Sequence, residues 1–359
     1  MSAFPESILI TGGAGFIGST LALFIKARHP SARIACMDNL YRRGSELNLP
    51  RLHDAGIEFL QGDIRSPEQF PNEPFELILE CSAEPSVLAG QDGSPDYVFQ
   101  TNLVGTYNCL ERARVWKSKF LFLSTSRVYP ITILEAHPWV EDATRFRWKE
   151  EGSPGISAAG VTENVSMNGA RSLYGFTKFA SEMLIEEYRA AFGLRAVIDR
   201  CGVIAGPWQM GKVDQGFLAL WVFNHLFEQP LRYIGYGGTG KQVRDVLHVG
   251  DLAELIEEQI ISFDEWEGWI GNVSGGMNNS VSLCELTETC AKLTGVTLPI
   301  HQEPENRPND VRIYIGDSSR LFARTDWRPK KSVGETAAEI LEWAEQCRAT
   351  LQPLFGPAK

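Results

Sequence analysis

The sequence predicts an α/β fold: a doubly wound parallel sheet over roughly the first 200 residues, followed by a smaller α/β unit. Short apolar runs typical of buried strands alternate with segments of helical period, which is the pattern of βαβ units. Crossovers between parallel strands are right-handed, so such units build one sheet with helices on both faces. The predicted strands lie at 7–11, 32–37, 57–60, 75–81, 120–124 and 196–201.

Two long helices are predicted at 95–116 and 172–192. Each carries apolar residues at three and four spacing, enough to face both the sheet and another subunit. We therefore expect a homodimer or homotetramer that forms through a four-helix bundle. After Gly202 the pattern changes to loops rich in Gly, Pro and Trp with shorter helices. The expected first domain is 1–201, with 238–262 returning to it, and the expected second domain is 202–237 with 263–359.

Composition excludes several classes of protein. The chain has 359 residues, and 34 basic against 45 acidic side chains give a net charge of -11, which would not attract a nucleic-acid backbone. Its longest apolar run, 216–227, is well short of the ~20 residues of a membrane span, and no secretory leader is recognisable. Seven cysteines without C-x-x-C spacing predict neither disulfides nor a metal site. We expect a cytoplasmic protein with no nucleic-acid, membrane or metal partner.

A glycine-rich turn, TGGAGFIG at 11–18, follows the first predicted strand and precedes a helix. It fits both G-x-G-x-x-G and G-x-x-G-x-x-G, the signatures of a dinucleotide-binding Rossmann domain. Glycine permits the tight turn and lets backbone N–H groups approach a pyrophosphate at the helix N-terminus. The predicted contacts of this turn with the cofactor are Gly12, Gly15, Phe16, Ile17 and Gly18.

Asp38 ends the second predicted strand, 20 residues after Gly18. A carboxylate there accepts hydrogen bonds from the adenosine ribose and repels a 2′-phosphate, which favours NAD over NADP. Arg42 and Arg43 could tolerate that phosphate, although solvent-exposed arginines are the simpler interpretation. Asp63, with Ile64, follows the third strand where the adenine would be reached, and the alternative is an ordinary loop aspartate.

Tyr174 and Lys178 are four residues apart and share one face of a predicted helix. A tyrosine with a pKa of ~10 is a poor base at neutral pH, but a lysine ammonium and a positive nicotinamide ring would both favour tyrosinate. A hydroxyl from the end of the fifth strand would complete the site. Ser124, Thr125 and Ser126 are the candidates.

Together these residues resemble the extended short-chain dehydrogenase/reductase family, the NAD-dependent epimerases, dehydratases and decarboxylases of nucleotide sugars. The family's hydroxyl lies four positions before the Tyr of a V-Y pair, here Val128-Tyr129, which implies Thr125 as the catalytic partner of Tyr174 and Lys178. The marks of the resemblance are residues 11–18, Asp38, 62–64, Thr101-Asn102, Ser124-Thr125, Tyr174, Lys178, 242–245, Arg307 and Asp310. The resemblance further implies cofactor contacts at Asn39, Cys81, Ser82, Asn102, Cys201 and Val203.

The chain departs from the family pattern directly after Thr125. Dehydratases of the family carry Asp-Glu there and the decarboxylases usually carry Glu, whereas this chain has Ser126 and Arg127. Redox chemistry without elimination remains, which implies epimerisation. The 44 residues between Tyr129 and Tyr174 are an insertion that we expect to cover the sugar.

Within the family, 80–86, 200–216 and 236–245 are most similar to CDP-paratose (CDP-tyvelose) 2-epimerases, which implies inversion at C-2 of a CDP-linked or GDP-linked hexose or deoxyhexose. Arg244 and Arg307 match the family's diphosphate ligands, since a guanidinium fork suits paired phosphate oxygens. Asp310 would bind the nucleotide ribose. The further candidate substrate contacts, each with a purely structural alternative, are Glu84, Ser126, Gln209, Asp214 and Gln215.

Two other functions remain open from the sequence. A UDP-sugar 4-epimerase would use the same three catalytic residues, but a different sugar carbon would lie under the nicotinamide. A non-catalytic NAD sensor would share the fold, and the intact Thr125, Tyr174 and Lys178 argue against it.

Overall fold

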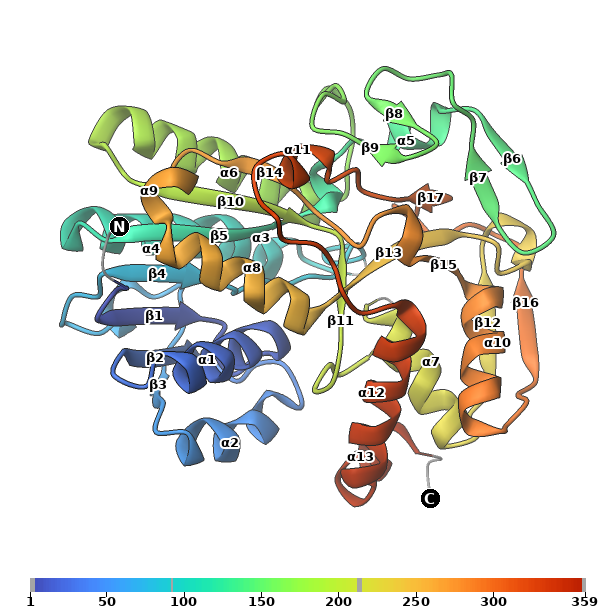
Figure 1. The fold of residues 1–359 in the computed structure, drawn as a ribbon, viewed down its shortest axis with the longest axis horizontal. Coiled ribbons are helices and arrows are strands. Elements are labelled where there is room, and N and C mark those ends of the chain that lie inside the picture. Colours follow the sequence, from blue (N-terminus) through green and yellow to red (C-terminus); the bar gives the residue numbers. More distant parts are fainter. Residues whose placement is uncertain (1–3, 92, 212–214, 357–359) are drawn as a thin grey trace. The chain divides into compact units, whose positions relative to one another are not determined.

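The computed structural model describes residues 4–91, 93–211 and 215–356, and the chain divides into two compact units (Figure 1). Unit 1 consists of Met1–Val128, Ser172–Cys201 and Leu252–Gly271, and unit 2 of Tyr129–Arg171, Gly202–Asp251 and Asn272–Lys359. These units differ from the expected domains in three segments. Residues 129–171 and 238–251 belong to unit 2, and residues 263–271 belong to unit 1.

Unit 1 contains the predicted doubly wound sheet, whose strands follow the order β14-β10-β5-β4-β1-β2-β3. The pairs β3-β2, β2-β1, β1-β4, β4-β5 and β5-β10 are all parallel. The six strands predicted from the sequence are all present, and β14 joins them from far along the chain. The strand bounds are β1 Ser7–Thr11, β2 Arg33–Asp38, β3 Glu58–Gln61, β4 Leu77–Glu80, β5 Lys119–Thr125, β10 Ala196–Cys201 and β14 Ile270–Val273.

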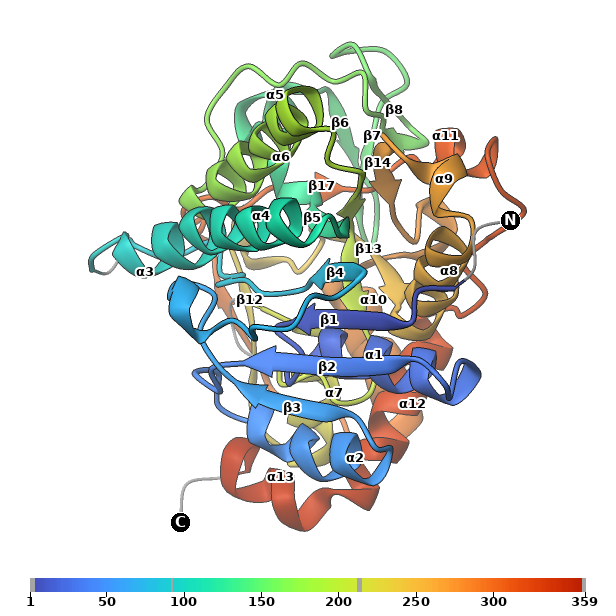
Figure 2. The same cartoon turned by 90° about the vertical axis from the view of Figure 1, so that its left-hand side faces the viewer.

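Helices cover both faces of this sheet (Figures 1 and 2). On one face, Arg28 of α1 forms an ion pair with Glu257 of α8, with 2.7 Å between Nε and Oε1. On the other face, Leu110 of α4 and Ile185 of α6 share a core cluster with the strand residue Phe120. The helix bounds are α1 Phe16–Arg28, α2 Leu49–Asp54, α3 Asp96–Phe99, α4 Gly105–Trp116, α6 Leu173–Phe192, α8 Val249–Ile261 and α9 Phe263–Trp266.

The predicted helix at 95–116 is not regular. A π-helical segment, Gln100–Val104, lies between α3 and α4 and contains the buried Asn102. Single π turns inside helices are frequent at functional sites because they change which side chains face inward. By contrast, α6 begins within one residue of the predicted start at 172. Ser172 caps this helix, because its side chain accepts a hydrogen bond from the Gly175 N–H at 3.1 Å.

Among its described residues, unit 2 has one four-stranded sheet, in which β13 pairs with β11, β15 and β17, and three two-stranded sheets, β12-β16, β6-β7 and β8-β9. Its strand bounds are β6 Trp139–Glu141, β7 Phe146–Trp148, β8 Ile156–Ser157, β9 Gly160–Val161, β11 Val203–Ala205, β12 Leu231–Ile234, β13 Val243–His248, β15 Ser280–Ser282, β16 Ile300–Glu303 and β17 Ile313–Tyr314. Its helix bounds are α5 Ile131–Ala136, α7 Phe217–Leu226, α10 Leu283–Thr294, α11 Ser319–Phe322, α12 Val333–Gln346 and α13 Arg348–Phe355.

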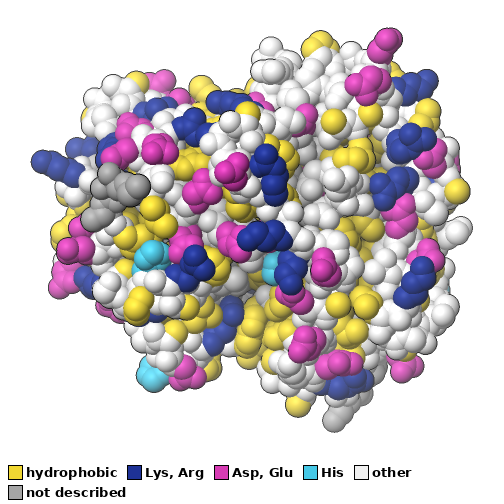
Figure 3. Space-filling view, in the orientation of Figure 1, with side chains coloured by type: hydrophobic (Ala, Val, Ile, Leu, Met, Phe, Trp, Pro, Cys, Tyr) yellow, Lys and Arg dark blue, Asp and Glu magenta, His cyan; other side chains and the backbone are white. Residues whose placement is uncertain are grey.

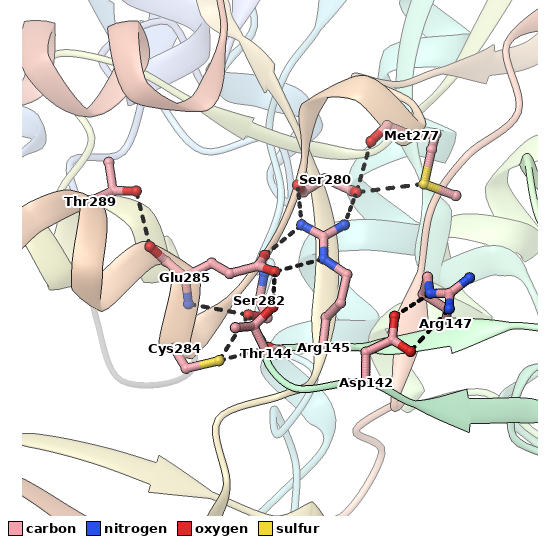
Figure 4. A network of polar contacts seen from close by, with 10 residues as sticks. All are labelled: Asp142, Thr144, Arg145, Arg147, Met277, Ser280, Ser282, Cys284, Glu285 and Thr289. Atoms are coloured by element: carbon pink, nitrogen blue, oxygen red, sulfur yellow. Dashed lines mark hydrogen bonds and ion pairs between the residues drawn. The ribbon is translucent and has the colours of Figure 1, made fainter.

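The insertion before α6 is bonded to the core of unit 2 (Figure 4). Arg145 binds Glu285 of α10 through two guanidinium nitrogens, at 2.8 and 2.5 Å, and donates to the hydroxyl of Ser280 at 2.9 Å. The backbone oxygen of Thr144 accepts from Ser282 at 2.7 Å. These contacts join residues about 140 positions apart in sequence, and they explain why 129–171 belongs to unit 2.

Candidate cofactor and catalytic site

The glycine turn of unit 1 is packed so closely that side chains would not fit. Gly12 has a φ of +65°, and a Cβ there would lie 2.8 Å from the Cys81 carbonyl carbon and from the Ser82 nitrogen. A Cβ on Gly18 would lie 2.3 Å from the Gly12 oxygen. Gly15 is the N-cap of α1, with Phe16 as the first helical residue. A helix N-terminus beside such a turn presents N–H groups to an anion, so these residues fit the pyrophosphate of a dinucleotide.

Three of the predicted cofactor residues form a polar edge after β2 and β3. Asp38 accepts hydrogen bonds from the Ala14 N–H at 3.1 Å and the Leu40 N–H at 2.8 Å, which fix its carboxylate beside the glycine turn. Asn39 donates to Asp63 at 2.9 Å. Partial burial opposes ionisation of Asp63, but hydrogen bonds from Arg65 and Asn39 prevail and lower its pKa to about 2. Burial raises the pKa of Asp38, and its hydrogen bonds from the Leu40 and Ala14 N–H groups oppose that change.

Other predicted cofactor residues are occupied within the protein. Asn102 accepts from the Glu84 N–H at 2.7 Å and donates to the Glu84 oxygen at 3.0 Å and to Thr177 at 3.1 Å. It thereby holds the loop after β4 against α6. Ile64 is buried in the core cluster of unit 1, and Cys201 is the buried last residue of β10. Val203 lies in unit 2, on β11.

The structure brings the predicted catalytic residues together at the ends of β5 and α6. Thr125 is the last residue of β5, Tyr174 lies in the first turn of α6, and Lys178 follows one turn later. All three are buried, with 8%, 9% and 2% of their surface exposed. Burial raises the pKa of Tyr174 to about 12, and hydrogen bonding to Thr125 acts in the opposite direction. At neutral pH the phenol is therefore protonated until more positive charge reaches it.

Lys178 lies over an aromatic ring of the sheet. Its Nζ is 3.7 Å from the centroid of the Phe122 ring. Burial lowers the pKa of Lys178, while the carboxylates of Glu80 and Glu182 oppose that change. Arg127, by contrast, favours the ionised form of Tyr174. The sequence identified Arg127 only as a departure from the dehydratase pattern, and its position two residues after Thr125 is the signal that could have suggested this effect.

A buried ion pair behind the catalytic residues was not predicted. Glu182 of α6 accepts from the hydroxyl of Ser124 at 2.5 Å and from Nη2 of Arg200 at 2.7 Å. The three side chains come from β5, α6 and β10, and all are buried. Ser124 precedes Thr125, and Glu182 is one turn after Lys178, so the network fixes both catalytic elements. A Glu four residues after Lys178 and an Arg inside a buried strand are visible in the sequence, but their pairing is not.

The predicted substrate residues are distributed over both units. In unit 1, the Glu84 carboxylate accepts from the Ser86 N–H at 3.1 Å, and Ser126 is buried in a 3-10 turn. In unit 2, the Gln209 amide donates to the Ile204 oxygen at 2.9 Å. Arg307 is half-buried in the segment 304–310, which contains no helix or strand, and Gln215 follows a gap in the described chain. Asp214 lies outside the described residues.

Arg244 and Asp310 bind each other in unit 2. The resemblance implies a different ligand for each, the diphosphate for Arg244 and the nucleotide ribose for Asp310. Nη2 of Arg244 lies 2.6 Å from Oδ1 of Asp310, and the same nitrogen donates to the Val311 oxygen at 2.6 Å. A diphosphate would have to compete with this pair for the guanidinium.

Several further features bear on the class of site. Within the described ranges, the structure contains no group of three His, Cys, Asp or Glu side chains that could hold a metal ion, and no helix long and apolar enough to span a bilayer. The seven cysteines are free thiols. On the face shown in Figure 3, basic and acidic side chains are interspersed rather than segregated.

Comparison with known proteins shows similarity along nearly the whole chain. The model of the NAD-dependent epimerase/dehydratase family matches residues 8–260. CDP-paratose 2-epimerase of Salmonella typhi is 30% identical over 94% of this chain and 98% of its own. dTDP-glucose 4,6-dehydratase of Mycobacterium tuberculosis is 30% identical over 97% of this chain and 96% of its own. The solved structure of UDP-glucose 4-epimerase of Thermus thermophilus with NAD is 26% identical, with a TM-score of 0.74 over 94% of this chain and 99% of that chain.

Proposed function

The chain belongs to the NAD-dependent epimerase/dehydratase family, and within it we propose that this protein is a nucleotide-sugar epimerase acting at C-2 of a CDP-linked or GDP-linked hexose or deoxyhexose. The predictions of NAD as the cofactor and of an enzyme of this family are confirmed. The observation that carries the proposal is the hydrogen-bonded pair of Thr125 and Tyr174. In the sequence, Thr125 is followed by Ser126 and Arg127, at the positions where a dehydratase has its acid and base.

In the proposed mechanism, Tyr174 accepts the proton of the reacting hydroxyl, and Thr125 holds that hydroxyl by a hydrogen bond. When bound, NAD supplies a hydride acceptor and a positively charged ring, which would lower the pKa of a neighbouring phenol. Burial of Tyr174 and Lys178 excludes water from the acid–base step. Arg127 adds positive charge that favours tyrosinate.

We assign recognition of the nucleotide to unit 2, through Arg244, Arg307 and Asp310. Binding energy at a remote group can hold an intermediate while its reacting ring turns over. The ion pair between Arg244 and Asp310 keeps both side chains ordered until a diphosphate and a ribose take their places. We propose that the side chains of Glu84, Gln209 and Gln215 contact the sugar or the base.

A panel of CDP-, GDP- and UDP-hexoses, incubated with purified enzyme and followed by proton NMR of the sugar ring, tests this function. Inversion at C-2 of a CDP-linked or GDP-linked sugar is the expected result. Inversion at C-4 of a UDP-sugar would replace the proposal with the UDP-sugar alternative, and a 4-keto-6-deoxy product would show a dehydratase. Binding of NAD without turnover of any of them would favour the sensor.

We also propose that the protein assembles through α4 and α6, which lie side by side in unit 1 (Figure 2). Five large apolar side chains on the two helices are exposed: Tyr107, Val115, Phe176, Met183 and Phe192. Val115 and Met183 have 61% and 52% of their surface exposed. An interface between subunits would bury these side chains, and exposed apolar patches typically mark such an interface.

A double substitution of Val115→Glu and Met183→Glu should therefore reduce the assembly to a smaller species, because it would bury charge at the helix contact. Light scattering coupled to size exclusion at micromolar concentration measures this. Leu293→Glu is the control, since Leu293 is also an exposed apolar helical residue but lies in unit 2. A monomeric wild type, or an unchanged mass in the double variant, would exclude this interface.

A further inference from the structure

Glu80 is a fully buried carboxylate that the proposed mechanism does not use. It is the last residue of β4, and it lies opposite Phe122 of β5 in the parallel register. Side chains alternate along a strand, and Ile78, two residues earlier, belongs to the core cluster beneath α4 and α6. Glu80 therefore faces the same two helices. Lys178 reaches the same place from α6, with its ammonium over the Phe122 ring.

The hydrogen bonds of Glu80 do not account for its burial. Oε1 accepts from the Thr106 hydroxyl at 2.6 Å, the Cys109 thiol is a weak further donor to the carboxylate, and Oε2 is buried without a nitrogen or oxygen donor among the described residues. A buried carboxylate with an unpartnered oxygen costs free energy unless a positive charge compensates it. Burial raises the pKa of Glu80 to about 7, and the ammonium of Lys178 is the strongest effect in the opposite direction.

Among the carboxylates around Lys178, Glu80 opposes the lowered pKa of the lysine most strongly, and Glu182 does so less. Glu182, on the same helix, is already paired with Arg200 of β10. The thiols of Cys81 on the loop after β4, Cys109 on α4 and Cys201 on β10 are neutral, because burial raises the pKa of each. The phenol of Tyr174 is also neutral, for the same reason.

We propose that Glu80 is a positioning residue that holds Lys178 in its ammonium form, as the buried counter-charge of the catalytic lysine. The inference rests on the proposed catalytic roles of Tyr174 and Lys178. Two buried positive groups, Lys178 and Arg200, are then balanced by two buried carboxylates, Glu80 and Glu182. An ammonium that stays charged through neutral and mildly alkaline pH keeps the side chain in the form that can donate to a ligand and favour tyrosinate nearby.

The direct test measures the ionisation of Lys178 without any substrate. The chain has 11 lysines, so selective ¹³Cε labelling gives few signals, and the signal lost in Lys178→Met identifies the residue. In Glu80→Gln the pKa of Lys178 should fall by about 1 or more, the usual effect of removing a nearby opposite charge. In Glu80→Asp, which keeps the negative charge, the pKa of Lys178 should stay close to its wild-type value. An unchanged titration of Lys178 in Glu80→Gln would overturn the inference.

Asp199→Asn is the matched control. Asp199 is a buried carboxylate of β10 in the same unit, but it accepts from Gln259 at 3.0 Å and Trp269 at 3.1 Å instead of facing a lysine. Its loss should leave the titration of Lys178 unchanged. If the enzyme turns over one of the sugars, kcat can be measured as a function of pH. The fall of kcat at alkaline pH should then begin at lower pH in Glu80→Gln and at the wild-type pH in Asp199→Asn. If no sugar is turned over but Lys178 still titrates lower, the proposed function fails and the role of Glu80 stands.

A second measurement covers the case in which Glu80→Gln does not fold. Folding raises the pKa of Glu80, so its ionisation costs stability as pH rises through the folded value. Without Lys178 that folded pKa rises further. Lys178→Met should therefore lose more stability, relative to wild type, at about pH 9 than at about pH 6. An equal loss at both pH values would contradict the pairing of Glu80 with Lys178.

Discussion

Replacing Tyr174 by Phe should lower kcat by ~100-fold or more while NAD remains bound, because the variant keeps the ring and loses only the proton acceptor. The position of the phenol supports this expectation. It is buried at the start of α6, beside the Thr125 hydroxyl, and its pKa of about 12 means that few molecules ionise without added positive charge. The measurement is single-turnover and steady-state kinetics on the accepted sugar, with the NAD content of the purified protein as the check on integrity.

Tyr188→Phe is the control for this substitution. Tyr188 lies on the same helix, and its hydroxyl donates to Glu111 at 2.5 Å. The control substitution therefore also removes a hydroxyl and its hydrogen bond. Its substitution should change stability slightly and leave kcat almost unaltered. Near-normal turnover in Tyr174→Phe would remove Tyr174 from the mechanism.

Replacing Lys178 by Ala should lower kcat to a comparable degree and also reduce the amount of NAD retained. The family resemblance implies that this lysine bonds the nicotinamide ribose, and the structure holds its ammonium over Phe122, in the middle of β5. Loss of a charged hydrogen-bond donor typically weakens binding by about 1.5–3 kcal/mol, or roughly 10-fold to 100-fold. NAD per chain after gel filtration, measured by chromatography of the released nucleotide, gives the result.

Lys119→Ala serves as the comparison, because Lys119 lies on the same strand as Thr125 but at its opposite end, with its ammonium 5.2 Å from the Phe263 ring centroid. That variant should retain NAD. Full NAD retention in Lys178→Ala would contradict the role in cofactor binding, even if turnover were lost.

Local sequence patterns predicted most of unit 1, because its signals are themselves local. Apolar runs located the six strands, and helical spacing placed the long helix at 172–192, within one residue of α6. The glycine turn could be predicted from spacing alone, since the close approach of Gly18 to Gly12 leaves no room for a side chain. Tyr174 and Lys178 followed from helical spacing in the same way.

Contacts between distant segments could not be predicted. The pairing of Glu182 with Arg200, and of Arg244 with Asp310, depends on which strands and loops meet in three dimensions. The two units differ from the expected domains for the same reason. The insertion before α6 has no compositional mark of unit 2. Its place is shown by long-range contacts such as the ion pair between Arg145 and Glu285. Glu80 ends an apolar strand, but its relation to Lys178 needs the register with Phe122.

The central claim is that the sugar is oxidised and reduced again at one carbon, with Tyr174 exchanging only the hydroxyl proton. In that route the carbon-bound hydrogen never exchanges with water. Turnover in deuterium oxide, without added NAD, should therefore give an epimerised product with no carbon-bound deuterium at the inverted centre, as judged by mass spectrometry and proton NMR. Deuterium at that carbon would show deprotonation next to a ketone formed elsewhere on the ring, and it would contradict this mechanism.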